Sequence, residues 1–131
     1  MTSDEIVDAF FSRIASRDFA GVIDLYDDAV EIWQSHTQSI QSKAENVPHL
    51  EAVAGRTNIR HEVIDRCVDG DHVAARCRVH MDLPGRGPFE FPIAIFFTTA
   101  GGRITRLHEY VDSGVVAELT AALMAPAAGQ D

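Results

Sequence analysis

The sequence predicts an α+β fold in which helices pack on the concave face of a curved antiparallel sheet. Two observations support this prediction. Before Asn58, apolar residues recur mainly at helical spacing. From Asn58 onward the apolar period changes to two, and short turns separate four alternating stretches. The expected order is two helices, a strand, a third helix, four strands and a last helix.

The helices are expected where capping residues precede apolar stripes, at residues 3–16, 17–28, 42–55 and 113–124. Ser3, before an acidic first turn, begins the first helix, and Asp112 or Ser113 caps the last. Gly55 is a suitable stop for the third helix. Pro48 within that segment is unusual, and it can instead mark the first turn of a shorter helix.

The strands are expected where apolar and polar residues alternate. One precedes the third helix, and four follow it, at residues 29–36, 59–68, 72–83, 89–99 and 103–111. The turns between the last four carry Gly70, Gly85 and the Gly101–Gly102 pair. Strands of this length joined by such short turns predict an antiparallel meander.

Composition indicates one globular domain. The chain has 131 residues, of which 46% are apolar and 24% charged, and its net charge is −9. This acidic balance argues against binding to nucleic acid or to anionic membranes. The acidic, helix-like N-terminus does not resemble a signal peptide, so a cytoplasmic location is expected. We expect the domain to span residues 1–125, and residues 126–131 to form a flexible tail.

Neither cysteine lies in a recognised metal-ligand spacing. Cys67 and Cys77 both fall in predicted strands, and no CxxC or Cys/His pattern surrounds them. Free thiols are the favoured interpretation, although the sequence leaves a disulfide between them open. No Gly-rich nucleotide motif is present, so neither a metal nor a cofactor is expected.

Alternation assigns faces to three of the strands. In residues 72–83 the apolar parity goes inward, and its members are Ala75, Cys77, Val79 and Met81. In residues 59–68 the parity without arginine goes inward, and its members are Ile59, His61, Val63, Asp65 and Cys67. Residues 89–97 are apolar on both parities, as in a strand covered on both faces. A homodimer through the outer sheet face would supply the second cover.

The segments FFSRIASRDFAGVIDLYDDAVEIW, DGDHVAARCRV and GGRITRLHEYVDS, with the order of elements, resemble the NTF2-like or SnoaL-like cone fold. The resemblance covers almost the whole chain. It implies a pocket between the concave sheet and the helices. It does not imply one activity, because this fold hosts isomerases, hydrolases, cyclases, dehydratases and non-catalytic modules.

Two catalytic sets of that superfamily are absent. Phe10, Trp33 and Ala94 stand where ketosteroid isomerase carries its tyrosine, base and protonated aspartate. The arginines of residues 72–83 fall on the outward parity, which does not match the Asp-Arg-Asp arrangement of limonene epoxide hydrolase. The segment LHEYVDS instead resembles polyketide-cyclase-like members, in which a carboxylate on this strand serves as the pocket acid or base. That resemblance implies that Glu109 faces the cavity.

The candidate catalytic residues are therefore Glu109, His61 and Asp65. Burial against Trp33 and Phe96 would raise the pKa of Glu109, His61 would be the complementary group, and Asp65 would orient it. The candidate ligand-binding residues are Trp33, Phe10, Ile14, Tyr26, His36, His49, Cys77, Val79, Phe96, Leu107 and Val111.

Each of these residues also has a structural interpretation, such as packing, an ion pair or a helix cap. Two functions follow. One is a cofactor-free isomerase, cyclase or lyase that acts on a small apolar ligand with a carbonyl group. The alternative is a ligand-binding or dimerisation module without catalysis.

Overall fold

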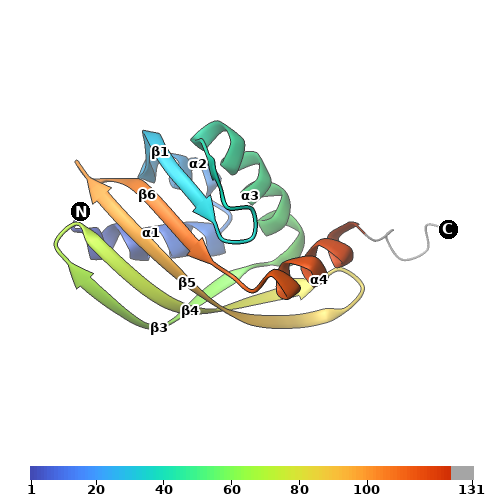
Figure 1. Cartoon of the computed structure of the whole chain (residues 1–131). Helices are drawn as coiled ribbons and strands as arrows, with labels where there is room; N and C mark the ends of the chain where they lie inside the picture. The colour runs from blue at the N-terminus through green and yellow to red at the C-terminus, as the bar shows by residue number, and fades with distance from the viewer. Residues whose placement is uncertain (125–131) are drawn as a thin grey trace.

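One curved sheet of six strands forms the frame of the molecule, and helices cover one of its faces (Figure 1). The computed structural model describes residues 1–124; residues 125–131, which include the predicted tail, lie outside the described residues. The elements are α1 (Ser3–Ala15), α2 (Phe19–Leu25), β1 (Tyr26–Gln34), β2 (Ser39–Gln41), α3 (Lys43–Thr57), β3 (Arg60–Asp69), β4 (His72–Leu83), β5 (Gly87–Ala100), β6 (Arg103–Tyr110) and α4 (Ser113–Met124). The predicted α+β class is confirmed.

The strand order is β2-β1-β6-β5-β4-β3. The meander from β3 to β6 is antiparallel, as expected. However, β1 pairs parallel with β6, so the sheet is mixed rather than wholly antiparallel. The edge strand β2 was not predicted, because its three residues are too few to show a period.

The helix boundaries follow local capping chemistry. The first helix begins at Ser3, as predicted, and Thr2 caps it in a capping box with Glu5. Ser42 and Glu45 form the same box at α3, so that helix begins at Lys43 and contains Pro48 in its second turn. It ends at Asn58, whose φ of 53° is left-handed, and runs past the predicted stop at Gly55.

A β-bulge in β3 corrects the predicted faces of that strand. Val63 pairs with Cys77 and Asp65 pairs with Arg76, which leaves Ile64 as an extra residue. Because one inserted residue reverses the parity, Asp65 turns to the outer face with Arg76, and Cys67 is exposed. The prediction that these two residues face inward was wrong. Arg66 takes the inward parity instead, opposite Ala75.

The inward-facing Arg66 connects β3 to α1 through hydrogen bonds. Its guanidinium donates to Asp4 at 2.7 Å and to Asp8 at 2.8 Å. The Ser3 hydroxyl donates to the Gly70 carbonyl at 2.6 Å in the following turn. These contacts fix the first half of α1 across the end of the β3–β4 hairpin.

Aromatic packing covers the middle of the concave face. Phe10 and Phe11 of α1 meet Phe97 of β5 edge to face, with ring centroids 5.4 and 5.9 Å apart. None of the helices in residues 1–124 is long and apolar enough to cross a membrane.

We predict that Arg66→Met lowers the free energy of unfolding by roughly 1–2 kcal/mol, because two charge-assisted hydrogen bonds of a partly buried guanidinium are lost. Arg76→Met is the matched control. Arg76 also pairs with an aspartate, but both side chains are more than 60% exposed, so its loss should cost under about 1 kcal/mol. Urea denaturation measures the free energy of unfolding of both variants. An equal decrease in the two variants would contradict the role given to Arg66.

Candidate functional site

A cavity of about 210 Å³ lies between the concave sheet face and helices α1, α3 and α4. Its lining is mostly apolar, and ten predicted site residues belong to it: Phe10, Ile14, Tyr26, His36, His49, His61, Val79, Leu107, Glu109 and Val111. An engineered apolar cavity of about 150 Å³ holds benzene, so this one accommodates a ligand somewhat larger than one ring.

The opening of the cavity can be located from exposure. Only three lining residues are exposed, namely His36 in the β1–β2 segment, His49 on α3 and Thr120 on α4. The other lining residues are buried or half-buried. The mouth therefore lies where these three elements meet, at the end of the sheet that α4 overhangs (Figure 1).

Among the described residues, Glu109 is the one carboxylate in this lining. It projects from β6 on the same parity as Leu107 and Val111, so the alternation of the strand brings it inside. Its Oε1 accepts a hydrogen bond of 3.3 Å from the Gln34 side-chain amide on β1. Surrounding protein removes most of its hydration, and this desolvation raises the pKa of Glu109 above its usual range, while the bond from Gln34 acts in the opposite direction.

The groups near Glu109 are neutral. Tyr26, buried at the base of β1, donates its hydroxyl to the Asn46 side-chain oxygen at 3.3 Å. Burial, and secondarily the negative charge of Glu109, raise the pKa of Tyr26. Burial likewise raises the pKa of the Cys77 thiol to about 11. Proton exchange with Glu109 near neutral pH therefore does not involve a tyrosinate or a thiolate.

His61 lines another part of the cavity. Its ring lies against Phe11, with centroids 4.8 Å apart, and its Nδ1 is buried without a hydrogen-bond partner. Desolvation lowers the pKa of His61 to about 4, so the imidazole is neutral at neutral pH. A neutral imidazole with a free nitrogen can bind a ligand through one hydrogen bond.

His61 and Glu109 are not neighbours. Glu109 pairs with Ile95 on β5, and Ile95 pairs with Ala75 on β4. His61 pairs with Val79, which lies four residues farther along β4 than Ala75. Strands lie about 4.8 Å apart and residues about 3.3 Å apart along a strand, so the two Cα atoms are roughly 20 Å apart over the sheet surface. The two side chains can touch opposite ends of one ligand, but they do not form the predicted acid–base pair.

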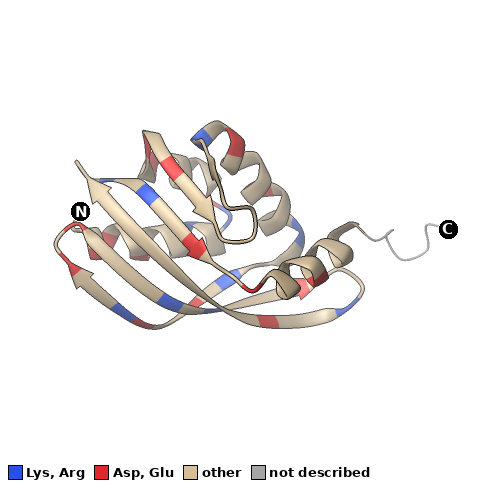
Figure 2. Cartoon of the chain, in the orientation of Figure 1, with Lys and Arg blue, Asp and Glu red and all other residues tan. Residues whose placement is uncertain are grey.

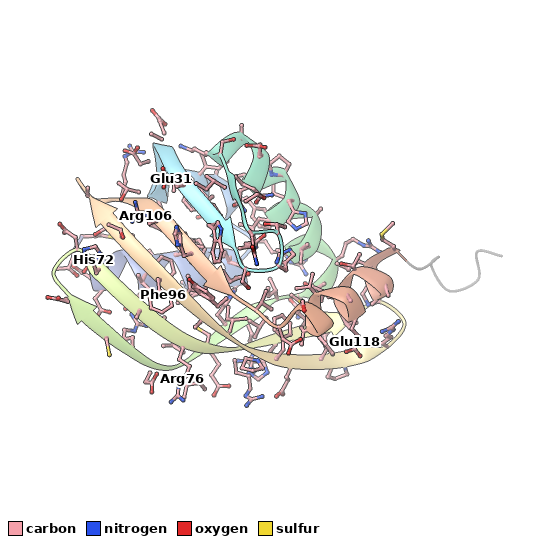
Figure 3. All side chains as sticks on the ribbon, viewed as in Figure 1. Glu31, His72, Arg76, Phe96, Arg106 and Glu118 are labelled. Atoms are coloured by element: carbon pink, nitrogen blue, oxygen red, sulfur yellow. The ribbon has the colours of Figure 1, made fainter. Side chains whose placement is uncertain are left out.

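Four predicted site residues lie outside the cavity lining. Asp65 lies on the outer face because of the bulge, and its carboxylate accepts from Arg76 at 2.6 and 3.1 Å. Trp33 and Phe96 also take the outer parity, where Trp33 packs on His108 and Phe96 is 49% exposed (Figure 3). Cys77 is buried in the core beside the cavity. The apolar nature of Trp33 and Phe96 does not reveal which face they take, whereas Cys77 faces inward as its parity predicted.

Sequence reasoning missed Gln34 and Asn46, the two amides of the site. Gln34 has the same parity as Ile32 on β1, and this parity could have indicated its direction. Asn46 is buried on α3 and donates to the Gln41 side chain at 3.2 Å. No group of three or more possible metal ligands occurs within residues 1–124, and both cysteines there are free.

Comparison with known proteins gives the family. The family model of the SnoaL-like domain matches residues 7–107. The chain belongs to the SnoaL-like domain family. Members of this family bind small molecules, and the cavity lies where the fold resemblance implied. No protein with curated function matches the sequence.

Several solved structures share the SnoaL-like fold of this chain. PrhC from Penicillium brasilianum has a TM-score of 0.82 at 20% identity, covering 92% of this chain and 87% of PrhC. TerC co-crystallised with polyporic acid has a TM-score of 0.76 at 18% identity, covering 89% of this chain and 96% of TerC. A putative polyketide cyclase from Pseudomonas putida KT2440 has a TM-score of 0.72 at 24% identity, covering 91% of this chain and 98% of the cyclase.

We predict that the free energy of unfolding of the wild type falls as pH rises, and that Glu109→Gln abolishes this fall. Below the usual glutamate pKa of 4.5, Glu109 is protonated in both states and contributes no pH dependence. As pH rises from there toward the raised folded pKa, the unfolded chain ionises first and the folded state loses stability. Each unit of upward shift costs about 1.4 kcal/mol.

Urea denaturation across the pH range, read as the difference between wild type and variant, measures this effect. Glu118→Gln is the control, because Glu118 is exposed on α4 (Figure 3). A constant difference between wild type and Glu109→Gln from pH 4 upward would show that Glu109 is solvated rather than enclosed.

Proposed function

We propose that this SnoaL-like protein catalyses a proton transfer beside a carbonyl group of a small, largely apolar ligand, with Glu109 as the acid–base group. One observation carries the proposal: among residues 1–124, the only carboxyl group in the cavity lining is half-buried between mostly apolar side chains, and its pKa is raised. A carboxyl group whose pKa moves toward neutrality can both take and return a proton near pH 7.

The reaction needs only side-chain chemistry. The Glu109 carboxylate removes a proton from the carbon next to the carbonyl, and the electron pair of that C–H bond forms an enolate. Where the ligand has a C=C bond next to that carbon, the resulting carboxylic acid returns the proton to the far carbon of this bond, which moves the double bond. Alternatively, the enolate attacks a second carbonyl of the same ligand and closes a ring, and the carboxylic acid gives its proton to the alkoxide that forms. Both outcomes conserve atoms and electrons without an oxidant or reductant.

Two other groups inside the cavity, Gln34 and His61, suit uncharged polar atoms of a ligand. Gln34 holds one oxygen of Glu109, which orients the carboxyl group. His61 offers an unpaired nitrogen far from Glu109 and can fix the opposite end of the ligand. A putative polyketide cyclase and a protein crystallised with polyporic acid share the fold, which supports a small organic ligand at low identity.

We predict that the protein accelerates hydrogen–deuterium exchange at the carbon next to the carbonyl of 1-indanone in D₂O. This ketone is slightly larger than one ring and carries exchangeable protons. Glu109→Gln should slow the catalysed exchange by about 10²–10⁴-fold, the usual contribution of a positioned acid–base group. The wild-type rate should rise with pH through the raised pKa of Glu109, because the base is the ionised form. Proton NMR follows the exchange.

Asp65→Asn is the matched control, since Asp65 is a carboxylate paired on the outer face. It should exchange like wild type. If 1-indanone binds in the cavity but exchanges no faster than in buffer, the alternative of a ligand-binding module without catalysis replaces the enzyme.

We also infer a homodimer through the outer sheet face. The ladder aligns Ile40, Trp33, His108 and Phe96 in one row across four neighbouring strands. Tyr110, which is 48% exposed, lies against both Trp33 and Phe96. An exposed aromatic row in the middle of a sheet, flanked by charged residues such as Arg106 and Glu31 (Figure 3), is the usual layout of an interface core and rim.

Phe96→Glu should shift the protein to monomer, because two copies of the row would then face each other with buried like charges. Val68→Glu is the control; Val68 is equally exposed, but it pairs with the buried Val73 on the concave parity. Sedimentation equilibrium measures the dissociation constant of each. An unchanged constant for Phe96→Glu, or a monomeric wild type, would exclude this interface.

A further inference from the structure

Two histidines stand at the mouth of the cavity and are not needed for the chemistry proposed above. His36 comes from the β1–β2 segment and His49 from α3, and both are exposed and line the cavity. Neither imidazole forms a hydrogen bond with any other residue in 1–124, so their ring N–H groups are free to donate.

The two imidazoles lie near each other. Partial burial lowers the pKa of His36, and the positive charge that His49 can carry lowers it further. A positive charge on His49 thus repels a positive charge on His36, and both ring N–H groups stand at the same mouth of the cavity. An anionic oxygen between them would remove this repulsion and accept a hydrogen bond from each.

Two acidic residues at the helix starts beside this mouth are engaged in helix caps. The segment between β1 and β2 carries no Asp, Glu, Lys or Arg (Figure 2). Glu45, one turn before His49, turns back to the backbone N–H of Ser42 in the capping box, at 3.0 Å. Asp112, at the start of α4, accepts from the N–H of Gly114 at 2.7 Å. Glu45 and Asp112 therefore serve helix starts, and Glu109 inside the cavity is bonded by Gln34, so none of these three carboxylates is hydrogen-bonded to His36 or His49.

We infer that His36 and His49 recognise a carboxylate head group on the ligand, whose apolar body extends into the cavity past Glu109. This inference rests on the proposed function, because it assumes that the cavity is the ligand site. His36 follows Gln34 by two residues, and Gln34 bonds Glu109, so the mouth lies beside Glu109 rather than beside His61. The reacting carbonyl of the ligand would then lie close to its head group, while His61 meets the opposite end of the ligand.

A matched pair of probes tests the head-group site. The carboxylate 3-phenylpropanoate and the neutral alcohol 3-phenylpropan-1-ol share one apolar body and differ in the head group. Calorimetric titration at about pH 6, where an ordinary histidine is partly protonated, gives the dissociation constant of each probe. The measured quantity is the ratio of the two constants in wild type and in the double variant His36→Gln/His49→Gln.

The ratio of the alcohol constant to the carboxylate constant should be about tenfold or more lower in the double variant than in the wild type. A tenfold change corresponds to one charge-assisted hydrogen bond. The affinity of the double variant for the alcohol should not change, since the cavity is intact. A second measurement follows the histidine signals of the wild type by NMR as pH is varied. Bound carboxylate should raise the pKa of His36, and bound alcohol should not. His72→Gln, on the outer face, is the control and should leave both constants unchanged (Figure 3).

Each other result is decisive. If the alcohol binds in the cavity but the ratio is the same in wild type and double variant, the head-group site is wrong and the proposed function stands. If neither probe binds to the wild type, ligands of this size do not use the cavity, and both proposals fail.

Discussion

The site depends on the desolvation of one carboxyl group. Glu109 projects into a cavity whose walls are mainly aliphatic and aromatic, and its single hydrogen bond in the described residues comes from a neutral amide. Ionisation in such a place is costly, because protein replaces much of the hydration of the carboxylate and the described lining holds no arginine or lysine to compensate its charge. A leucine or glutamine would satisfy the fold better. A group that burdens stability and also faces an open cavity is characteristic of a site retained for chemistry.

The register of the sheet decides which side chains share that cavity. The parallel pairing of β1 with β6 puts Gln34 opposite Glu109. At the other edge, the bulge at Ile64 divides β3 into two halves with opposite parity. Before the bulge, His61 faces the cavity; after it, Arg66 faces α1 and binds Asp4 and Asp8. One inserted residue thus allows the same strand to line the cavity and to anchor the first helix.

Much of the fold was predictable, because it follows from periodicity and capping. The alternating stretches and the helical stripes gave the element order, and the inward position of Glu109 followed from its parity with Leu107 and Val111 together with the family resemblance. The errors have physical reasons. A bulge leaves no mark on the alternation of β3, so Asp65 was placed on the wrong face. Trp33 and Phe96 are apolar, and an apolar residue is equally compatible with a cavity and with an exposed patch. The distance between His61 and Glu109 depends on the pairing of four strands, which no local pattern contains.

The cavity has a polarity gradient that constrains any mechanism. Its mouth carries two exposed histidines, Glu109 lies just inside, and His61 lies across the sheet with a buried, unpaired nitrogen. A uniformly apolar ligand would leave that nitrogen without a partner, and a fully polar one would lose its hydration against aliphatic walls. The best-matched ligand therefore has polar atoms at its two ends and an apolar body between them. Under the proposed function, Glu109 would act on the end of the ligand at the mouth, and His61 would set which way round the ligand enters.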